Sequence, residues 1–128
     1  MISRIFFNKT VLITGHTGFK GSWLSMWLAH LGAKVVGVSS KEISEPSNFL
    51  ASKISNVIDD RRFDIRDSNA IKALVEEVRP DFVFHLAAQA LVRPSYKNPL
   101  ETMTTNAIGT ANVLDALRIL DKKIVAVM

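Results

Sequence analysis

Residues 10–21 read TVLITGHTGFKG, and this stretch decides the fold. A short apolar run is followed by Gly15, Gly18 and Gly21, after which apolar residues recur with the spacing of a helix. A residue without Cβ suits, in turn, a tight bend after a strand, the close approach of a pyrophosphate, and the packing of a helix on that strand. A helix that begins here would offer backbone N–H groups and the positive end of its dipole to a phosphate. We therefore predict a dinucleotide-binding corner; the alternative is a glycine-rich turn with no ligand.

The rest of the chain alternates short apolar runs with longer segments of helical period. This pattern predicts an α/β fold of the Rossmann type, a doubly wound parallel sheet with helices on both faces. We expect strands at residues 11–13, 35–38, 62–65, 81–86 and 124–128. Right-handed crossovers then give the strand order 3-2-1-4-5. The sheet is expected to be truncated at its fifth strand, which would leave an unpaired edge and make the isolated chain associate.

Three longer helices are expected between these strands. The first should end at Gly32 and bury a stripe that places both tryptophans in the core, and its residues are Phe19, Trp23, Leu24, Trp27, Leu28 and Leu31. The second should be capped by Asp67 or Ser68, end before Pro80, and bury Ile71, Leu74, Val75 and Val78. The third should be long, with one apolar face made by Leu100, Met103, Ala107, Val113, Leu114, Leu117 and Leu120. Residues 39–55 are expected to be a loop with a short helical turn, and a second loop should contain Pro94 and Pro99.

Composition limits the classes of protein that this chain could belong to. With 128 residues, 48% of them hydrophobic, residues 1–128 suit one globular dinucleotide-binding domain. The 16 basic and 12 acidic residues are scattered, which suits an anionic ligand and gives no sign of nucleic acid as a partner. Cysteine is absent, no leader is recognisable, and no apolar run approaches the roughly 18 residues of a membrane span, so we expect a cytoplasmic protein without a membrane partner. The three histidines lack the spacing of a zinc site, so no metal is expected.

Four short strings identify a family. Residues 14–21 (TGHTGFKG), 64–67 (DIRD), 85–89 (HLAAQ) and 105–110 (TNAIGT) together resemble the extended short-chain dehydrogenases/reductases that act as sugar-nucleotide epimerases and dehydratases. Within that group, residues 15–25 (GHTGFKGSWLS) and 87–96 (AAQALVRPSY) resemble the CDP-glucose 4,6-dehydratases. The resemblance spans nearly the whole chain. It implies NAD as cofactor, a nucleotide sugar as substrate, and a homodimer formed through the long helix in the full-length protein.

The residues and the resemblance together give a set of candidate site residues. The candidate cofactor-binding residues are Gly15, Thr17, Gly18, Phe19, Gly21, Ser39, Asp64, Ile65, Leu86, Ala87, Ala88 and Asn106, and the candidate substrate-binding residues are Gln89, Arg93 and Ser95. By resemblance Asp64 and Ile65 contact adenine. Simpler roles stay open: Thr17 could only stabilise the turn, Asp64 could be a turn or cap residue, and Arg93 could be an exposed surface residue. Ala87 and Ala88 could be small for close packing alone.

Two departures from the family pattern affect the cofactor and the chemistry. Ser39, Ser40 and Lys41 stand where an acidic residue would bind the ribose of NAD, and a lysine there could meet the 2′-phosphate of NADP. Because of the resemblance we place NAD ahead of NADP. The family's Tyr-x-x-x-Lys pair is missing, since the single tyrosine, Tyr96, has no lysine four residues on. The chain alone is therefore expected not to catalyse, and the alternatives to a dehydratase are another nucleotide-sugar enzyme or a non-catalytic NAD(P) sensor.

Two polar residues at apolar positions call for partners. His85 ends an apolar run, and we expect a buried neutral imidazole bonded to the backbone rather than a general base. Asn106 lies inside the long helix, which is unfavourable unless its amide is paired. By resemblance its partner is the loop after the fourth strand, or the cofactor there.

Overall fold

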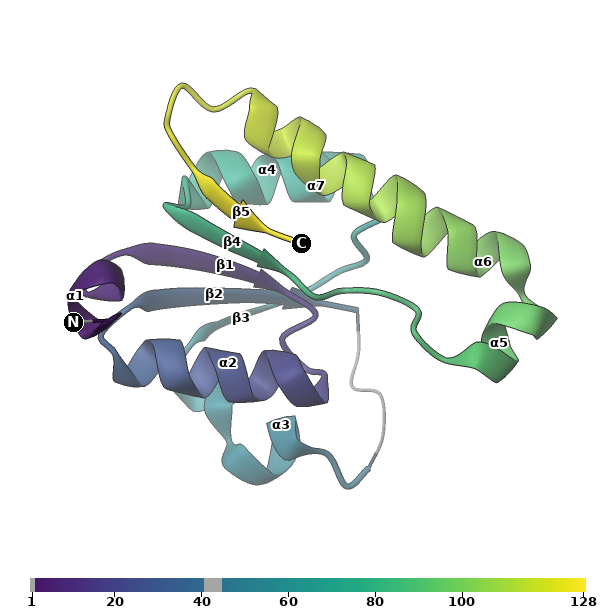
Figure 1. Cartoon of the computed structure of the whole chain (residues 1–128), viewed down its shortest axis with the longest axis horizontal. Helices are drawn as coiled ribbons and strands as arrows, with labels where there is room; N and C mark the ends of the chain where they lie inside the picture. The colour runs from purple at the N-terminus through teal and green to yellow at the C-terminus, as the bar shows by residue number, and fades with distance from the viewer. Residues whose placement is uncertain (1, 41–44) are drawn as a thin grey trace.

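The computed structural model describes residues 2–40 and 45–128 as a parallel sheet between two layers of helices (Figure 1). The strand order β3-β2-β1-β4-β5 confirms the predicted topology. The strands are β1 (Thr10–Thr14), β2 (Lys34–Ser39), β3 (Asp59–Arg62), β4 (Phe82–His85) and β5 (Val125–Val127). Since all four pairings are parallel, every strand ends at the same edge of the sheet.

Helices cover both faces of the sheet, as Figure 1 shows. One face carries α2 (Phe19–His30), α3 (Asn48–Ser52) and the short 3₁₀ helix η1 (Ile54–Asn56). The other carries α4 (Ser68–Val78) and α7 (Gly109–Arg118), while α1 (Ile2–Phe6) precedes β1. None of the helices in the described part of the chain is long and apolar enough to cross a membrane.

Each face of the sheet has its own hydrophobic core, because side chains alternate along a strand. In β1, Val11 and Ile13 face α2 and α3, where they join Leu28, Val35, Phe49, Ile54 and Ile58. Leu12 faces the other layer and joins Val36, Val38, Ile65, Ile71, Leu74, Val75, Val83, Val113, Ala116 and Leu117. The buried set on α4 confirms the predicted apolar face, and Asp67 caps this helix by accepting a hydrogen bond from Ala70 N at 3.0 Å.

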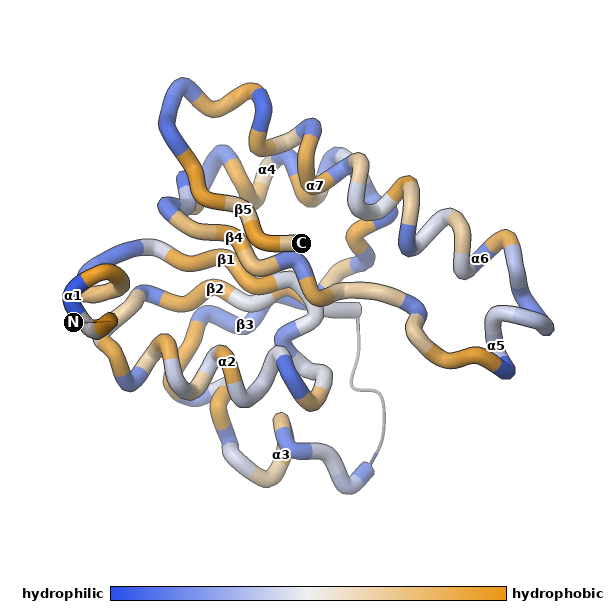
Figure 2. Tube along the Cα trace, viewed as in Figure 1, coloured by the Kyte–Doolittle hydropathy of each residue, from blue (hydrophilic) through white to orange (hydrophobic). Residues whose placement is uncertain are grey.

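The third strand lies three residues earlier than predicted. β3 has the sequence DDRR, which Figure 2 colours as hydrophilic beside the apolar central strands. Arg61 pairs with Asp59 at 2.7 Å and with Glu77 of α4 at 2.7 Å. Charged side chains are common on edge strands because they oppose pairing with another chain. The prediction failed because such a strand has no apolar pattern.

The tryptophans of α2 are not in the core, which corrects the predicted stripe. Trp23 is 55% exposed, Trp27 is 52% exposed and Phe19 is 72% exposed. The residues of α2 that face the sheet are instead Gly21, Ser22, Ser25 and Leu28. Small residues are needed there because the helix backbone packs very close to the β1 loop. The last residue of α2 is His30, and Gly32 stops the helix two residues later, as predicted, with a φ of +83° that suits glycine.

The chain after β4 also differs from the prediction. Residues expected to form a loop contain a short helix, α5 (Val92–Lys97), with Pro94 in its first turn. The predicted long helix consists of α6 (Pro99–Met103), a π-helical turn η2 (Thr104–Ile108) and α7. Of its predicted apolar face, Val113 and Leu117 in α7 are buried, whereas Leu114 and Ala107 are exposed, and so are Leu100 and Met103 where α5 and α6 project past the sheet (Figure 1). β5, expected to be buried, is exposed at all three residues.

Candidate functional site

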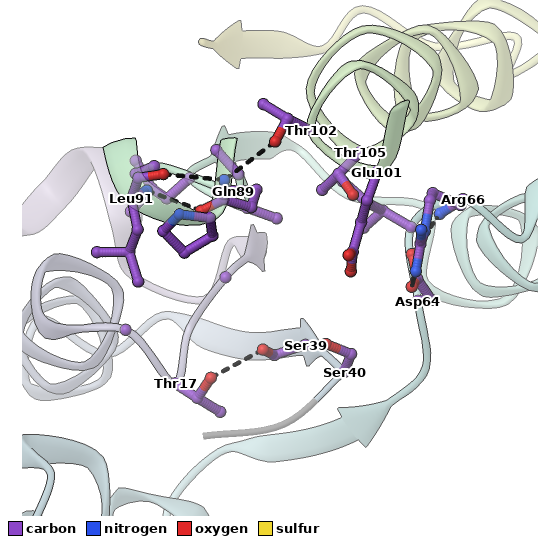
Figure 3. A pocket seen from close by; sticks show the side chains of 18 of the residues that line it. Thr17, Ser39, Ser40, Asp64, Arg66, Gln89, Leu91, Glu101, Thr102 and Thr105 are labelled. Atoms are coloured by element: carbon purple, nitrogen blue, oxygen red, sulfur yellow. Dashed lines mark hydrogen bonds and ion pairs between the residues drawn. The ribbon is translucent and has the colours of Figure 1, made fainter. Parts of the chain in front are cut away.

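A cavity of about 670 Å³ opens at the carboxyl edge of the sheet. It lies where β1 and β4 meet and their connections leave on opposite faces, which is the usual ligand site of an open α/β sheet. Figure 3 shows the Thr17–Ser39 pair below, Asp64 and Arg66 on one side, and the loop around Gln89 with Thr102 on the other. The lining residues are Gly15, Thr17, Gly18, Ser39, Ser40, Phe63, Asp64, Ile65, Arg66, Leu86, Ala87, Ala88, Gln89, Ala90, Leu91, Pro94, Asn98, Glu101, Thr102 and Thr105.

The three glycines of the first loop have the separate positions that their spacing predicts. Gly15 has a φ of +76°, and a Cβ there would lie 2.7 Å from Ala87 N, so the turn and the neighbouring loop both require glycine. A Cβ on Gly21 would overlap the carbonyl oxygen of Gly15, which confirms close packing of helix on loop. Gly18 lines the cavity and is the N-cap of α2. The contacts of all three glycines with a cofactor, including that of Gly18 with a pyrophosphate, stay predictions.

The N-terminus of α2 faces this cavity. Gly18 has no side chain to cap the helix, so the first-turn N–H groups are not bonded by the N-cap. These donors, together with the helix dipole, suit an anionic group. Phe19 and Gly21 are not among the lining residues, so a contribution of these predicted residues is limited to their backbone N–H groups.

Hydroxyls connect the first loop to the end of β2. Thr17 Oγ1 and Ser39 Oγ are 2.8 Å apart, and both residues line the cavity. Thr17 therefore does bond within the protein at this turn, which matches the simpler of its two predicted roles and leaves its contact with a ligand a prediction. Ser40 also lines the cavity, whereas Lys41 lies outside the described residues.

Asp64 bonds within its own turn, which matches the simpler of its two predicted roles and leaves its contact with adenine a prediction. Its Oδ2 accepts from Arg66 Nε at 3.0 Å and its Oδ1 accepts from Arg66 N at 2.8 Å. The hydrogen bonds from Arg66 lower the pKa of Asp64, so the carboxylate stays ionised. Asn112 of α7 donates to the carbonyl oxygens of Ile65 and Arg66 at 3.0 Å each and so anchors this segment.

The loop after β4 is tied to the π turn by a pair of hydrogen bonds. Gln89 N donates to Asn106 Oδ1 at 2.7 Å, and Asn106 Nδ2 donates to Gln89 O at 3.0 Å. This confirms that the partner of Asn106 is the loop after the fourth strand. Asn106 is not among the lining residues, so it supports the wall made by Leu86, Ala87, Ala88 and Gln89 from behind.

Two of the three predicted substrate residues are not at the cavity. Gln89 lines it and donates from Nε2 to Thr102 Oγ1 at 3.1 Å. Arg93 is exposed on α5, and the Ser95 hydroxyl donates to Val92 O at 2.6 Å within the same helix. Sequence reasoning missed Arg66, which follows β3 at the carboxyl edge, and it missed Glu101, Thr102 and Thr105, because only the fold brings α6 and η2 to that edge. The spacing of Thr102 and Thr105 on one helix face was a usable signal.

Two buried histidines lie behind the cavity walls. His85 bonds to Thr14 and Thr110 side chains, so the prediction of a buried imidazole is confirmed but its partners are hydroxyls and not the backbone. His16 is fully buried, and its Nε2 lies 2.7 Å from Asp60 Oδ1. Burial lowers the pKa of both imidazoles, although the hydrogen bond and charge of Asp60 oppose this for His16.

We expect the free energy of unfolding to fall as the pH drops below about 6.5, the ordinary pKa of histidine. Because both folded-state pKa values are lowered, the unfolded chain takes up these protons first. Each neutral histidine contributes fully to the free energy of unfolding when the pH is above the histidine pKa of the unfolded chain. That contribution is lost as the pH falls toward the lower histidine pKa of the folded protein, by no more than about 1.4 kcal/mol per pH unit for each histidine. Urea unfolding at about pH 7.5 and about pH 5.5 measures this difference. Equal stability at the two pH values would contradict it, since the lowered pKa of Asp64 and of Asp81 affects stability only at more acidic pH.

Comparison with known proteins finds relatives of the chain among sugar-nucleotide dehydratases and epimerases. A family model described as GDP-mannose 4,6 dehydratase matches residues 12–127. CDP-glucose 4,6-dehydratase of Salmonella typhimurium is 43% identical over 119 residues, which cover 92% of this chain and 33% of that protein. GDP-mannose 4,6-dehydratase of Vibrio cholerae is 33% identical over 122 residues, covering 88% of this chain and 32% of that protein. The chain spans about a third of the length of these curated relatives.

Solved structures give the same picture of the fold. An epimerase from Methanothermobacter thermautotrophicus superposes with a TM-score of 0.79 at 32% identity, over 93% of this chain and 34% of that one. A UDP-glucose 4-epimerase from Thermus thermophilus, solved as a complex with NAD, superposes with a TM-score of 0.75 at 30% identity, over 85% of this chain and 33% of that one.

Proposed function

The chain belongs to the GDP-mannose 4,6-dehydratase family of sugar-nucleotide dehydratases and epimerases, and from this premise we propose that its cavity binds NAD. We further propose that residues 1–128 are the dinucleotide-binding domain of a sugar-nucleotide 4,6-dehydratase. The observation that carries the proposal is the glycine corner, where φ of Gly15 and the packing of Gly21 hold an uncapped helix N-terminus at the cavity.

The residues present fit a dinucleotide. A cavity of about 670 Å³ is within the range of cofactor sites, and its lining includes residues at the carboxyl ends of four strands. The first turn of α2 and Gly18 would hold the diphosphate, because backbone N–H groups there meet no cap. Asp64 and Ile65 would meet the adenine at one end, and Ala87 and Ala88 would let the second ribose approach β4. The Asp64 Oδ1 atom keeps room for an additional donor, since Arg66 N is the single donor recorded on it among the described residues.

NAD is preferred over NADP for two reasons. The neighbouring Thermus thermophilus epimerase was solved with NAD. In addition, the described lining has one cationic side chain, Arg66, whose guanidinium already pairs with Asp64 at 2.6 Å; Lys41, the residue predicted to meet a 2′-phosphate, lies outside the described residues. A 2′-phosphate would need a cation that is free to bind it.

For the reaction, we propose conversion of CDP-glucose to CDP-4-keto-6-deoxyglucose by the whole protein, acting as a lyase. Support comes from the 43% identity to the Salmonella typhimurium enzyme. Bound NAD would supply the hydride acceptor and donor for carbons 4 and 6 of the hexose. The residues of this chain would orient that cofactor and, through Gln89, border the sugar. Proton transfer is assigned to residues outside these 128, so we propose that this part alone is inactive.

The main alternative is a nucleotide-sugar epimerase, which the likeness to epimerase structures supports. The product formed from CDP-glucose distinguishes the two, because a dehydratase yields a keto sugar and water. A non-catalytic NAD(P) sensor would bind the dinucleotide without turning over any nucleotide sugar. We also propose a cytoplasmic homodimer through the exposed apolar side of α6 and η2, where Leu100, Met103 and Ile108 are uncovered.

Replacing Gly18 by valine tests the proposed cofactor site. The backbone at Gly18, with φ −69° and ψ 169°, is extended and accepts valine without strain, so the fold should persist. The new side chain would enter the space of the diphosphate and remove charge-assisted hydrogen bonds. We expect NAD affinity, measured by isothermal calorimetry, to fall by about tenfold or more.

The matched control is Lys34→Val. Lys34 is exposed at the amino end of β2, at the opposite edge of the sheet from the cavity, and valine suits a strand. This variant should bind NAD like the unchanged protein. If Gly18→Val binds NAD as tightly as Lys34→Val, this loop is not the phosphate site.

A further inference from the structure

His85 is the centre of a chain of side-chain hydrogen bonds behind the cavity wall. Its Nδ1 lies 2.7 Å from Thr14 Oγ1 at the end of β1, and its Nε2 lies 2.8 Å from Thr110 Oγ1 in α7. Thr14 Oγ1 also accepts from Ala87 N at 3.2 Å, and it shares the Leu86 N–H, at 3.2 Å, with the Thr14 backbone oxygen, which accepts it at 3.0 Å. Thr110 Oγ1 donates to Asn106 O at 2.7 Å. The chain therefore begins at two residues of the cavity wall and ends at the π turn.

Counting the hydroxyl protons, starting from Thr110, gives the direction of the hydrogen bonds in this series. A threonine hydroxyl has one proton to donate and two lone pairs to accept with. Since Thr110 gives its proton to Asn106 O, it accepts from His85, which places a proton on Nε2. His85 is then neutral with Nδ1 as an acceptor, and Thr14 gives its proton to Nδ1 while its lone pairs accept from Leu86 N and Ala87 N.

The other neutral tautomer does not satisfy the same groups. With the proton on Nδ1, Thr14 Oγ1 would have to accept from His85 and Ala87, which leaves the Leu86 N–H to the Thr14 carbonyl oxygen alone, and the hydroxyl proton would lose Nδ1 as its acceptor. Thr110 would need two protons to bond both His85 Nε2 and Asn106 O. A buried polar group that loses its partner is costly, so the two tautomers are not equivalent here.

We propose that His85, as the neutral Nε2–H tautomer, is a positioning residue that aligns the Leu86 and Ala87 backbone for the dinucleotide. The proposal rests on the proposed function, because it assumes that NAD lies against this wall. The alignment matters because Ala87 N is also the atom that a Cβ on Gly15 would meet, at 2.7 Å. Through Thr14 and this contact, His85 sets the spacing between the glycine loop after β1 and the loop after β4.

The hydrogen bonds at the Thr110 end of this series also lead to the cavity wall, through Asn106. Asn106, whose carbonyl accepts from Thr110, uses its side chain to hold both backbone groups of Gln89. Leu86, Ala87 and Gln89 are therefore fixed by one connected set of bonds that passes through His85. A neutral imidazole is suited to this place because one ring nitrogen can accept from the Thr14 hydroxyl while the other donates to the Thr110 hydroxyl.

The test combines a spectroscopic measurement with a pair of threonine variants. In the unchanged protein, ¹⁵N–¹H correlation spectra of the imidazole at about pH 7.5 should show His85 neutral with its proton on Nε2. Thr110→Val removes both bonds of that hydroxyl without changing the side-chain shape, and we expect NAD affinity to fall about fivefold. Thr110→Ser keeps the hydroxyl and should stay within about twofold of the unchanged protein.

Several results would overturn the proposal. An imidazole protonated on Nδ1 would refute the hydrogen-bond assignment, and equal NAD affinity of the serine and valine variants would refute the positioning role. Thermal unfolding of both variants checks that the valine protein is folded. If the unchanged protein binds no NAD, the proposed function fails, and the tautomer measurement still decides the assignment of the hydrogen bonds.

Discussion

Replacing Gly21 by alanine should destabilise the protein by about 3 kcal/mol, at the upper end of the usual cost of overpacking. A Cβ at this position would overlap Gly15 O and lie 2.8 Å from His16 Cα. Both neighbours are backbone atoms of a loop whose shape is fixed on its other side by Ala87. The better helix propensity of alanine, worth about 1 kcal/mol, does not offset this overlap. Urea unfolding followed by far-ultraviolet circular dichroism measures the change.

Gly109→Ala is the matched control, since Gly109 is also a buried glycine in a helix that packs tightly. Its Cβ would meet the Ile65 side chain, with Cδ1 2.6 Å away. A side chain can rotate where a backbone cannot, and here too alanine is the better helix former. We expect a change of about 1 kcal/mol or less. Similar losses in both variants would show that the Gly21 contact with the loop is not the special constraint.

The tight packing at Gly21 is one of the features that could be predicted from the sequence. The spacing of Gly15, Gly18 and Gly21 after an apolar run was enough to predict the turn and the close packing, because few other residues tolerate either. The strand order followed from the alternation of apolar runs and from the handedness of crossovers. Asn106 was predicted to need a partner because an amide inside a helix is unfavourable without one.

Features that depend on tertiary contacts were not predictable in the same way. The helix α2 was predicted correctly, but the face that it buries was not. The residues that face the sheet must have small side chains where the helix meets the loop after β1, and this leaves Trp23 and Trp27 exposed. β3 was misplaced because an edge strand of charged residues has no apolar pattern. Glu101 and Thr102 reach the cavity only because α5 turns α6 back over the carboxyl edge.

The histidine of the glycine loop gives the second large effect. We expect Asp60→Ala to destabilise the protein by about 2 to 3 kcal/mol. His16 is fully buried, its Nε2 lies 2.7 Å from Asp60 Oδ1, and its Nδ1 has no hydrogen-bond partner in the part of the chain that the structure describes. Without Asp60, His16 Nε2 would lose its hydrogen bond while Nδ1 already lacks one, and a buried polar group without a partner carries the full cost of desolvation. Arg62, whose Nε lies 2.8 Å from the same Asp60 oxygen, would lose that contact as well.

Asp60→Asn separates the hydrogen bond from the charge. An asparagine keeps an oxygen in place of Oδ1 that can accept from His16 Nε2, although its amide nitrogen replaces the Oδ2 that accepts from Arg62 Nη2 at 3.1 Å, so we expect a loss of about 1 kcal/mol, smaller than that of the alanine variant. The imidazole itself is confined, because its ring meets Phe49 edge-on at 5.3 Å and a Cβ on Gly37 would overlap it, so His16 cannot turn toward another acceptor. Urea unfolding of the two variants near neutral pH gives the comparison. If alanine and asparagine destabilise equally, the charge of Asp60 matters more than its hydrogen bond, and the loop is held to β3 by electrostatic attraction instead.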